Sequence, residues 1–168
     1  LYNTLVLPYL NYCNIIWAAN YQTRLEHLVK LQKRVIRIIC GTGRTDHTSS
    51  LFKNLKILKV GDINLLQTCL FMYQLYHQLI PKQFLSYFSI NSQIHDHFTR
   101  SHQNYHIRAA RTNIRKFTII CHGPSAYNNL PDNIKASLSV AMFKNRMKTF
   151  LFVSSWPSAF VRLVKNAI

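Results

Sequence analysis

The chain contains 168 residues, of which 21 are Lys or Arg and 5 are Asp or Glu, so its formal net charge is +16 at pH 7. This excess of cations favours a polyanionic partner, above all nucleic acid, and the 48% hydrophobic content excludes an intrinsically disordered chain. The shortage of acids also argues against a complete two-metal phosphoryl-transfer enzyme. That chemistry needs at least two carboxylates converging on ions about 4 Å apart, and the nearest pair here, Asp46 and Asp62, is sixteen positions apart.

Residues 1–23 carry no charge, so both a membrane span and a soluble helix are open for this stretch. Its polar residues fall within an arc of about 100° when each residue turns the helix by 100°, and Pro8 interrupts the run. These polar residues are Asn3, Thr4, Asn11 and Asn14. A lipid-exposed helix has little use for such a stripe, whereas a half-buried helix does. We therefore expect a soluble core helix here and no membrane partner.

The next segment has the clearest helical pattern. Thr23 and Glu26 have the spacing of a capping box, and Gly41 supplies a left-handed stop. One side of this helix is apolar, and the opposite side is basic over an arc of about 100°. The basic stripe consists of Lys30, Lys33, Arg34 and Arg37.

Residues 41–50 are rich in Gly, Thr and Ser and predict a loop, followed by a short helix over 51–55 and an extended piece over 57–60. Residues 63–79 form a third helical pattern without a charged side chain, and Pro81 stops it. Its polar side contains Asn64, Gln67, Thr68, Gln74 and Gln78. Such a helix is buried on most faces or packs on another domain.

The composition changes after residue 90. Residues 91–116 are polar and rich in His and Arg, which predicts a long exposed loop or a thin β-ribbon. The β-branched run 117–121 ends at Gly123 and Pro124 and predicts a strand that pairs with 105–107. Short helical turns over 125–130 and 132–136 and an amphipathic helix over 139–153 complete the chain. The expected fold class is mainly α, a helical bundle with a small β-hairpin in the C-terminal half.

Most of the five acids have a local explanation. Glu26 fits the capping box, and Asp62 and Asp132 stand at expected helix starts, where a carboxylate accepts backbone N–H bonds. Asp46 has the same position before the short helix, while Asp96 has no local role. We therefore assign no catalytic residue.

Two basic groups are the candidate nucleic-acid-binding residues. The first is the helical stripe, and the second is interleaved with Tyr105, His106 and Phe117, whose rings could stack on unpaired bases. The alternative is a solvated surface whose charges serve solubility alone. The second group consists of Arg100, Arg108, Arg111, Arg115 and Lys116.

The cysteines and histidines do not indicate a cofactor or a metal site. Cys13, Cys40, Cys69 and Cys121 form no CxxC pair, which argues against a zinc ribbon and a disulfide framework. A histidine-rich stretch also invites a metal site or a His-based nuclease, which would lose cleavage on His95→Ala or His106→Ala. We favour a phosphate-facing loop, because zinc needs three or four ligands on a rigid frame. The stretch contains His95, Asp96, His97, His102 and His106.

Four stretches, taken in order, carry a family resemblance. They are LVLPYLNYCNIIW at 5–17, HTSSLFKNLKILKV at 47–60, FMYQLYHQLIP at 71–81 and TRSHQNYHIRAARTNIRKFTIICHGPSAYNNLPDNIK at 99–135. Together they resemble the C-terminal region of reverse transcriptases from non-LTR, LINE-type, jockey-like retrotransposons, over residues 1 to about 152. Tyr127 stands where relatives commonly have Trp.

The resemblance implies a thumb-like and post-thumb region that grips RNA or an RNA–DNA hybrid. The paired catalytic aspartates of the family's palm lie upstream of this region, so the chain is expected to be no enzyme on its own and to contact that palm in a longer protein. The expected division is a helical thumb-like region at 1–90, a basic loop, hairpin and C-terminal helix at 91–153, and a divergent tail at 154–168. Because the sequence begins with Leu1, we expect a fragment or a processed product. The alternative is an inactive relic of a degraded element.

Overall fold

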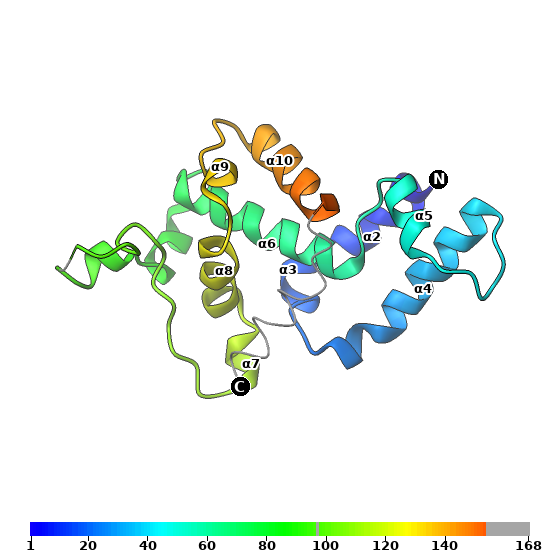
Figure 1. Ribbon diagram of the computed structural model, residues 1–168. Coiled ribbons are helices and arrows are strands. Elements are labelled where there is room, and N and C mark those ends of the chain that lie inside the picture. The colour runs from blue at the N-terminus through cyan, green and yellow to red at the C-terminus, as the bar shows by residue number, and fades with distance from the viewer. Residues whose placement is uncertain (97, 154–168) are drawn as a thin grey trace.

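The chain folds around one long helix, α6 (Val60–Tyr76), as the computed structural model in Figure 1 shows. The structure describes residues 1–96 and 98–153. The divergent tail expected at 154–168 and His97 lie outside the described residues. The described part is mainly helical, which confirms the expected class. Its helices are α1 (Tyr2–Leu5), α2 (Leu7–Asn11), α3 (Asn14–Trp17), α4 (Gln22–Cys40), α5 (Ser49–Asn54), α6, η1 (Lys82–Tyr87), η2 (Asn91–Gln93), α7 (Asn113–Lys116), α8 (Ile119–Asn128), α9 (Asp132–Lys135) and α10 (Val140–Val153).

Helix α6 is the centre of the core. Helices α8 and α10 pack against it from the C-terminal half of the chain, and α2, α3 and α4 pack against it from the N-terminal half. It is buried on most faces, including Met72 and Tyr73, as the lack of charge in residues 63–79 predicts. It begins three residues earlier than expected and ends at Tyr76, where Gln78 adopts a left-handed φ of 55°. The Leu79 N–H donates to Gln74 O at 2.8 Å, so a Schellman-type turn ends the helix before Pro81.

The expected β-hairpin is wrong. Residues 1–96 and 98–153 contain no strand, and Ile90 and Tyr105 form only an isolated antiparallel bridge. Residues 119–121 of the β-branched run form instead the first turn of α8, which Phe117 and Thr118 join to α7, and Gly123 and Pro124 lie inside α8. Burial against α6 overrides the local β preference. A Cβ added at Gly123 would lie 2.8 Å from Met72 Sδ, so glycine permits this close approach.

The segment expected to pair with that strand is held by a side chain. Asn128 on α8 accepts a hydrogen bond from Tyr105 N at 3.0 Å and donates one to Tyr105 O at 2.8 Å. The amide thus replaces a neighbouring strand for one residue. Tyr105 is buried as a result.

The uncharged N-terminal stretch forms three short helices where one helix was expected. The chain bends at Val6, two residues before Pro8, and again at Cys13, whose φ is 48°. Within the described residues, no helix is both long and apolar enough to cross a membrane. Five large apolar side chains of this stretch are exposed by 61–81%; these are Leu1, Leu5, Tyr9, Tyr12 and Ile16.

The acids at the helix starts behave differently from each other. The Thr23–Glu26 capping box is wrong, because α4 begins after Tyr21 and Glu26 pairs instead with Lys30 at 3.1 Å. Asp46 caps a turn of the loop by accepting the Gly43 N–H at 2.7 Å, and it does not cap α5. Asp62 and Asp132 do lie in the first turns of α6 and α9. Gly41 ends α4 with a φ of 63°, as expected.

Candidate nucleic-acid interface

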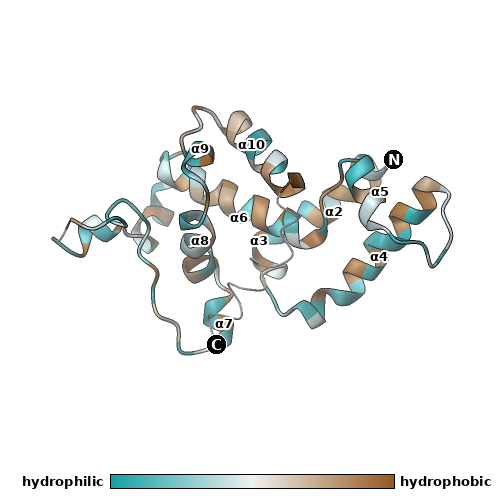
Figure 2. Ribbon diagram, viewed as in Figure 1, coloured by the Kyte–Doolittle hydropathy of each residue, from teal (hydrophilic) through white to brown (hydrophobic). Residues whose placement is uncertain are grey.

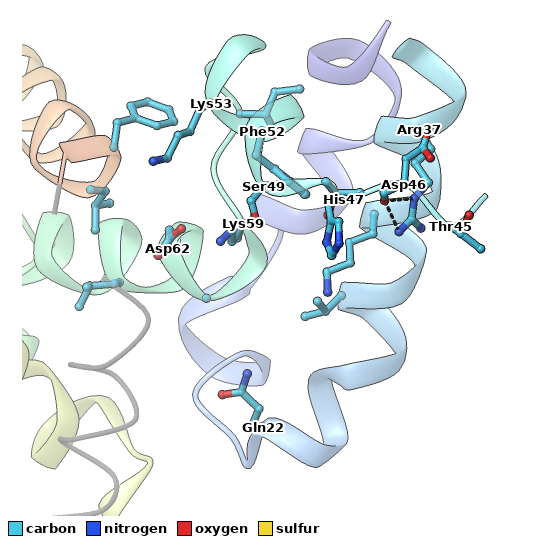
Figure 3. A pocket seen from close by; sticks show the side chains of 18 residues that line it. Gln22, Arg37, Thr45, Asp46, His47, Ser49, Phe52, Lys53, Lys59 and Asp62 are labelled. Carbon is cyan, nitrogen blue, oxygen red and sulfur yellow. Dashed lines mark hydrogen bonds between the residues drawn. The ribbon is translucent and has the colours of Figure 1, made fainter. Parts of the chain in front are cut away.

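A groove with basic walls lies between α4, the loop 41–48, α5 and the first turn of α6 (Figure 3). Its volume is about 620 Å³. Two acids, Asp46 and Asp62, also line it. Five basic or imidazole side chains line the groove: Lys33, Arg37, His47, Lys53 and Lys59.

Lys33 and Arg37 form the α4 wall of the groove, and Arg37 also holds the neighbouring loop in place. Lys33 and Arg37 are four residues apart, so they project from the same face of α4. The Arg37 guanidinium donates from Nε and Nη2 to the backbone oxygen of Asp46, at 3.0 and 2.9 Å (Figure 3). Because guanidinium has five N–H donors, this contact fixes the loop against α4 and leaves donors of Arg37 for a ligand.

The opposite wall contains Lys53 from α5 and Lys59, the residue that precedes α6. Both lysine side chains are exposed. The 17-residue helix α6 begins at this wall, so its positive dipole end adds to their field. Lys59 and α6 therefore present positive potential to the same space.

Asp62 lies in the same wall, at the third position of α6. Burial raises the pKa of the Asp62 carboxyl to about 6, while the charge of Lys59 and a hydrogen bond from the Lys59 backbone oppose the rise. The carboxylate is ionised at pH 7 and offsets part of the positive charge. Below about pH 6 its protonation leaves the groove more cationic.

One buried glutamine sets the position of α4 relative to the opposite wall. Gln32 Nε2 donates to the Tyr2 hydroxyl at 2.7 Å and to Leu58 O at 2.9 Å. Gln32 Oε1 accepts the Val60 N–H at 3.1 Å. The side chain thus joins α4 to α1 and to the start of α6, and the groove opens beside this junction.

The structure divides the sequence-predicted basic stripe. Lys33 and Arg37 enter the groove, Lys30 is engaged with Glu26, and Arg34 is exposed on α4 outside the residues that line the groove. Half of the stripe therefore belongs to the candidate site.

The second basic group spreads over a long path. Arg115 and Lys116 lie on α7, which approaches the beginning of α4 through an edge-to-face contact of Phe117 with Tyr21, with ring centroids 4.8 Å apart. Residues 91–96 and 98–104, which include Arg100, lie at the opposite end of the molecule from α4 (Figure 1). Arg108 and Arg111 lie in the connection between these two places.

Of the three aromatic residues expected to stack on bases, one is buried and another is half-buried against a neighbouring ring. Tyr105 is 6% exposed, and Phe117 packs on Tyr21. Burial raises the pKa of the Tyr105 hydroxyl, with smaller contributions from Tyr127 and Tyr76. That part of the expectation is therefore wrong for Tyr105, whose ring serves the core.

The sequence pattern missed three groove residues: His47, Lys53 and Lys59. A signal for the two lysines exists, because Lys53, Lys56 and Lys59 recur every three residues in LFKNLKILK. Nothing local indicates that this segment folds back beside α4, since the Gln32 junction that brings them together spans 26 to 30 residues. In Figure 2, α4 shows both teal and brown residues, as an amphipathic helix does.

The histidine-rich stretch does not converge on one point. The rings of His95 and His106 have centroids 6.4 Å apart, and His102 contacts Phe98. Among the described residues, no group of three or more His, Cys, Asp or Glu side chains has the arrangement of a metal site.

Comparisons with known proteins give no match to carry the interpretation further. A scan against protein-family models found no matching family. Searches of curated proteins and of solved structures found no match either.

Proposed function

We propose that this chain binds RNA or an RNA–DNA hybrid through the phosphates, with the basic groove as the principal contact and without catalysis of its own. The single observation that carries the proposal is the convergence of Lys33 and Arg37 from α4, Lys53 from α5 and Lys59, which precedes α6, on one groove. A phosphate backbone is the ligand that such a set of fixed and mobile cations fits best.

The proposal extends to the origin of the chain. Its ordered resemblance over residues 1 to about 152 supports a C-terminal, thumb-like part of a non-LTR retrotransposon reverse transcriptase. In that setting the upstream palm is a second partner, and the groove holds template or hybrid while the palm performs the chemistry.

Binding to a short RNA–DNA hybrid tests the groove directly. Replacing Lys53 and Lys59 by Gln removes two exposed cations from the groove wall, and we expect affinity to fall by about tenfold or more at moderate salt. The control is Lys82→Gln with Lys144→Gln, which removes the same charge from exposed sites that do not line the groove. Equal losses for both pairs would mean that overall charge, and not the groove, determines binding.

A second candidate is a fragment without activity. The observation that favours it is the apolar stripe of α1–α3, since Leu1, Tyr9 and Ile16 are each at least 80% exposed. Such a surface promotes association when its partner is missing. Size-exclusion chromatography with light scattering separates the two: a monomer that binds the hybrid supports the first proposal, and aggregates without binding support the second.

A further inference from the structure

The end of the molecule opposite α4 carries an exposed aromatic side chain that contacts a neighbouring histidine ring. Phe98 is 90% exposed, and its ring lies 4.9 Å from the ring of His102, with an interplanar angle of 36°. An exposed phenylalanine at a loop tip has no folding role of its own, because it leaves its apolar surface in water. Its ring is therefore available to a ligand.

The loop below Phe98 is ordered by hydrogen bonds. Asn91 N donates to Asn104 O and Ser92 N donates to His102 O, both at 3.0 Å. The Asn91 side chain donates to Ser101 O at 2.9 Å. The Phe98–His102 pair thus lies on a turn that three hydrogen bonds hold together.

A series of ring contacts continues from this turn toward the core. His95 lies near His106, and the neighbouring Tyr105 contacts Phe88 and Tyr76 edge to face, with centroids 6.4 and 6.5 Å apart. The Asn128 amide holds the Tyr105 backbone on α8. The tip is consequently connected to the folded body through side-chain contacts as well as through the backbone.

The chemistry of the tip combines a ring with a cation. Arg100 is exposed within the same turn, two residues from Phe98, and Asp96 is the acidic residue on the other side. Rings that stack on bases, flanked by guanidinium groups that meet the phosphates, are the usual elements of single-strand recognition. Inside a paired region both faces of each base are covered by its stacking neighbours, so such a ring has access only to unpaired bases or to the terminal pair of a duplex.

We infer that the Phe98–His102 tip, whose phenylalanine the sequence pattern did not indicate, stacks on an unpaired base of the bound nucleic acid. This inference rests on the proposed function, because the basic groove supplies the phosphate contacts, while the tip selects strands with unpaired bases. The two surfaces lie at opposite ends of the molecule (Figure 1), so one RNA would have to extend along the body to reach both.

The test compares a single-stranded RNA with a long RNA–DNA hybrid, in which terminal base pairs are a small share of the binding sites, at one fixed salt concentration. Phe98→Ala is expected to weaken binding of the single strand by about tenfold and to change binding of the hybrid by less than about twofold. Phe98→Trp is expected to restore the single-strand affinity, because the larger ring keeps the stacking surface. Leu138→Ala is the matched control, since Leu138 is also 90% exposed but lies away from the tip.

Each outcome decides between the possibilities. Equal single-strand affinities for Phe98→Ala, Leu138→Ala and the unmodified chain would overturn the inference and leave the ring to an apolar protein or lipid partner. Equal loss on the single strand and the hybrid would overturn it as well, because stacking requires a free base. If the unmodified chain binds neither probe, the proposed function itself fails. If it binds both and the groove variants weaken both, the groove stands whatever Phe98→Ala does.

Discussion

The C-terminal half and the N-terminal end of α6 are held to their neighbours by different interactions. Around its C-terminal half, apolar packing dominates: Tyr73 stacks on Phe143 with centroids 4.4 Å apart, and Tyr127 stacks on the same ring at 6.4 Å. At its N-terminal end, α4 is attached through the hydrogen bonds of Gln32, and in 19 residues α4 buries Gln32 and Ile36. The packed side, around the C-terminal half of α6, therefore determines the stability of the fold. The hydrogen-bonded side, where α4 meets the N-terminal end of α6, determines the geometry of the groove.

The largest expected effect belongs to the packed side. Phe143→Ala removes a ring with 0% exposure that contacts both Tyr73 and Tyr127, and should lower the free energy of unfolding by about 3–5 kcal/mol. Urea denaturation measures the loss. Met142→Ala on the same helix is the control, since Met142 is 37% exposed and should cost less than about 1 kcal/mol. Similar losses for both variants would contradict the central role of the aromatic cluster.

Gln32→Ala should have a smaller and more local effect. It leaves the Val60 N–H and Leu58 O without their buried partner, at a cost of about 2 kcal/mol. Hydrogen exchange should then increase in α4 before it increases in α6 and α8. The control is Gln22→Ala, at an exposed position of α4. Uniform loss of protection in all helices would show that α4 is no separate unit and would remove the distinction between the two sides.

The groove side should also respond to pH through Asp62. Because its pKa in the folded state is about 6, above the ordinary value of 3.8, the folded state binds the proton more tightly. The resulting stability is complete below about pH 4 and is lost as the pH rises through 6. Asp62→Asn should therefore become more stable, relative to the unmodified chain, by on the order of 1 kcal/mol between pH 4 and pH 7. An unchanged difference in the free energy of unfolding across this range would contradict the burial of the carboxyl.

Two glycines give the smallest and sharpest comparison. A methyl group at Gly123 meets Met72 Sδ at 2.8 Å and Ile119 Cδ1 at 3.1 Å, so Gly123→Ala should destabilise by about 1 kcal/mol. A methyl group at Gly61 meets nothing within 4 Å, so Gly61→Ala should stabilise α6 by about 0.5 kcal/mol. Thermal denaturation of both variants checks the signs. A gain at Gly123 would mean that α8 does not approach α6 this closely.

The helical class and the central helix were predictable because their signals are local. Residues 63–79 lack charge over almost five turns, and that pattern directly predicts burial. Gly41 likewise predicts the end of α4, because a left-handed residue at that place costs glycine little. These features depend on neighbours within a few residues.

The errors arise where tertiary contacts override local preference. The run at 117–121 has the composition of a strand, but Gly123 lets it join a helix that packs closely against Met72. Thr23 and Glu26 have the spacing of a capping box, yet Glu26 is better placed to pair with Lys30 one turn further on. Similarly, the α4 stripe predicted Lys33 and Arg37 of the groove. Lys53 and Lys59 could not be predicted, because the long-range hydrogen bonds of Gln32 bring their segment beside α4.

The most direct test of the basic groove is the salt dependence of hybrid binding. If Lys53 and Lys59 each neutralise a phosphate, the slope of log K against log salt concentration should decrease in magnitude by about 1.4 to 1.8 in the Lys53→Gln, Lys59→Gln variant. The Lys82→Gln, Lys144→Gln variant should keep the slope of the unmodified chain. A slope that is the same in all three proteins would contradict phosphate binding in the groove.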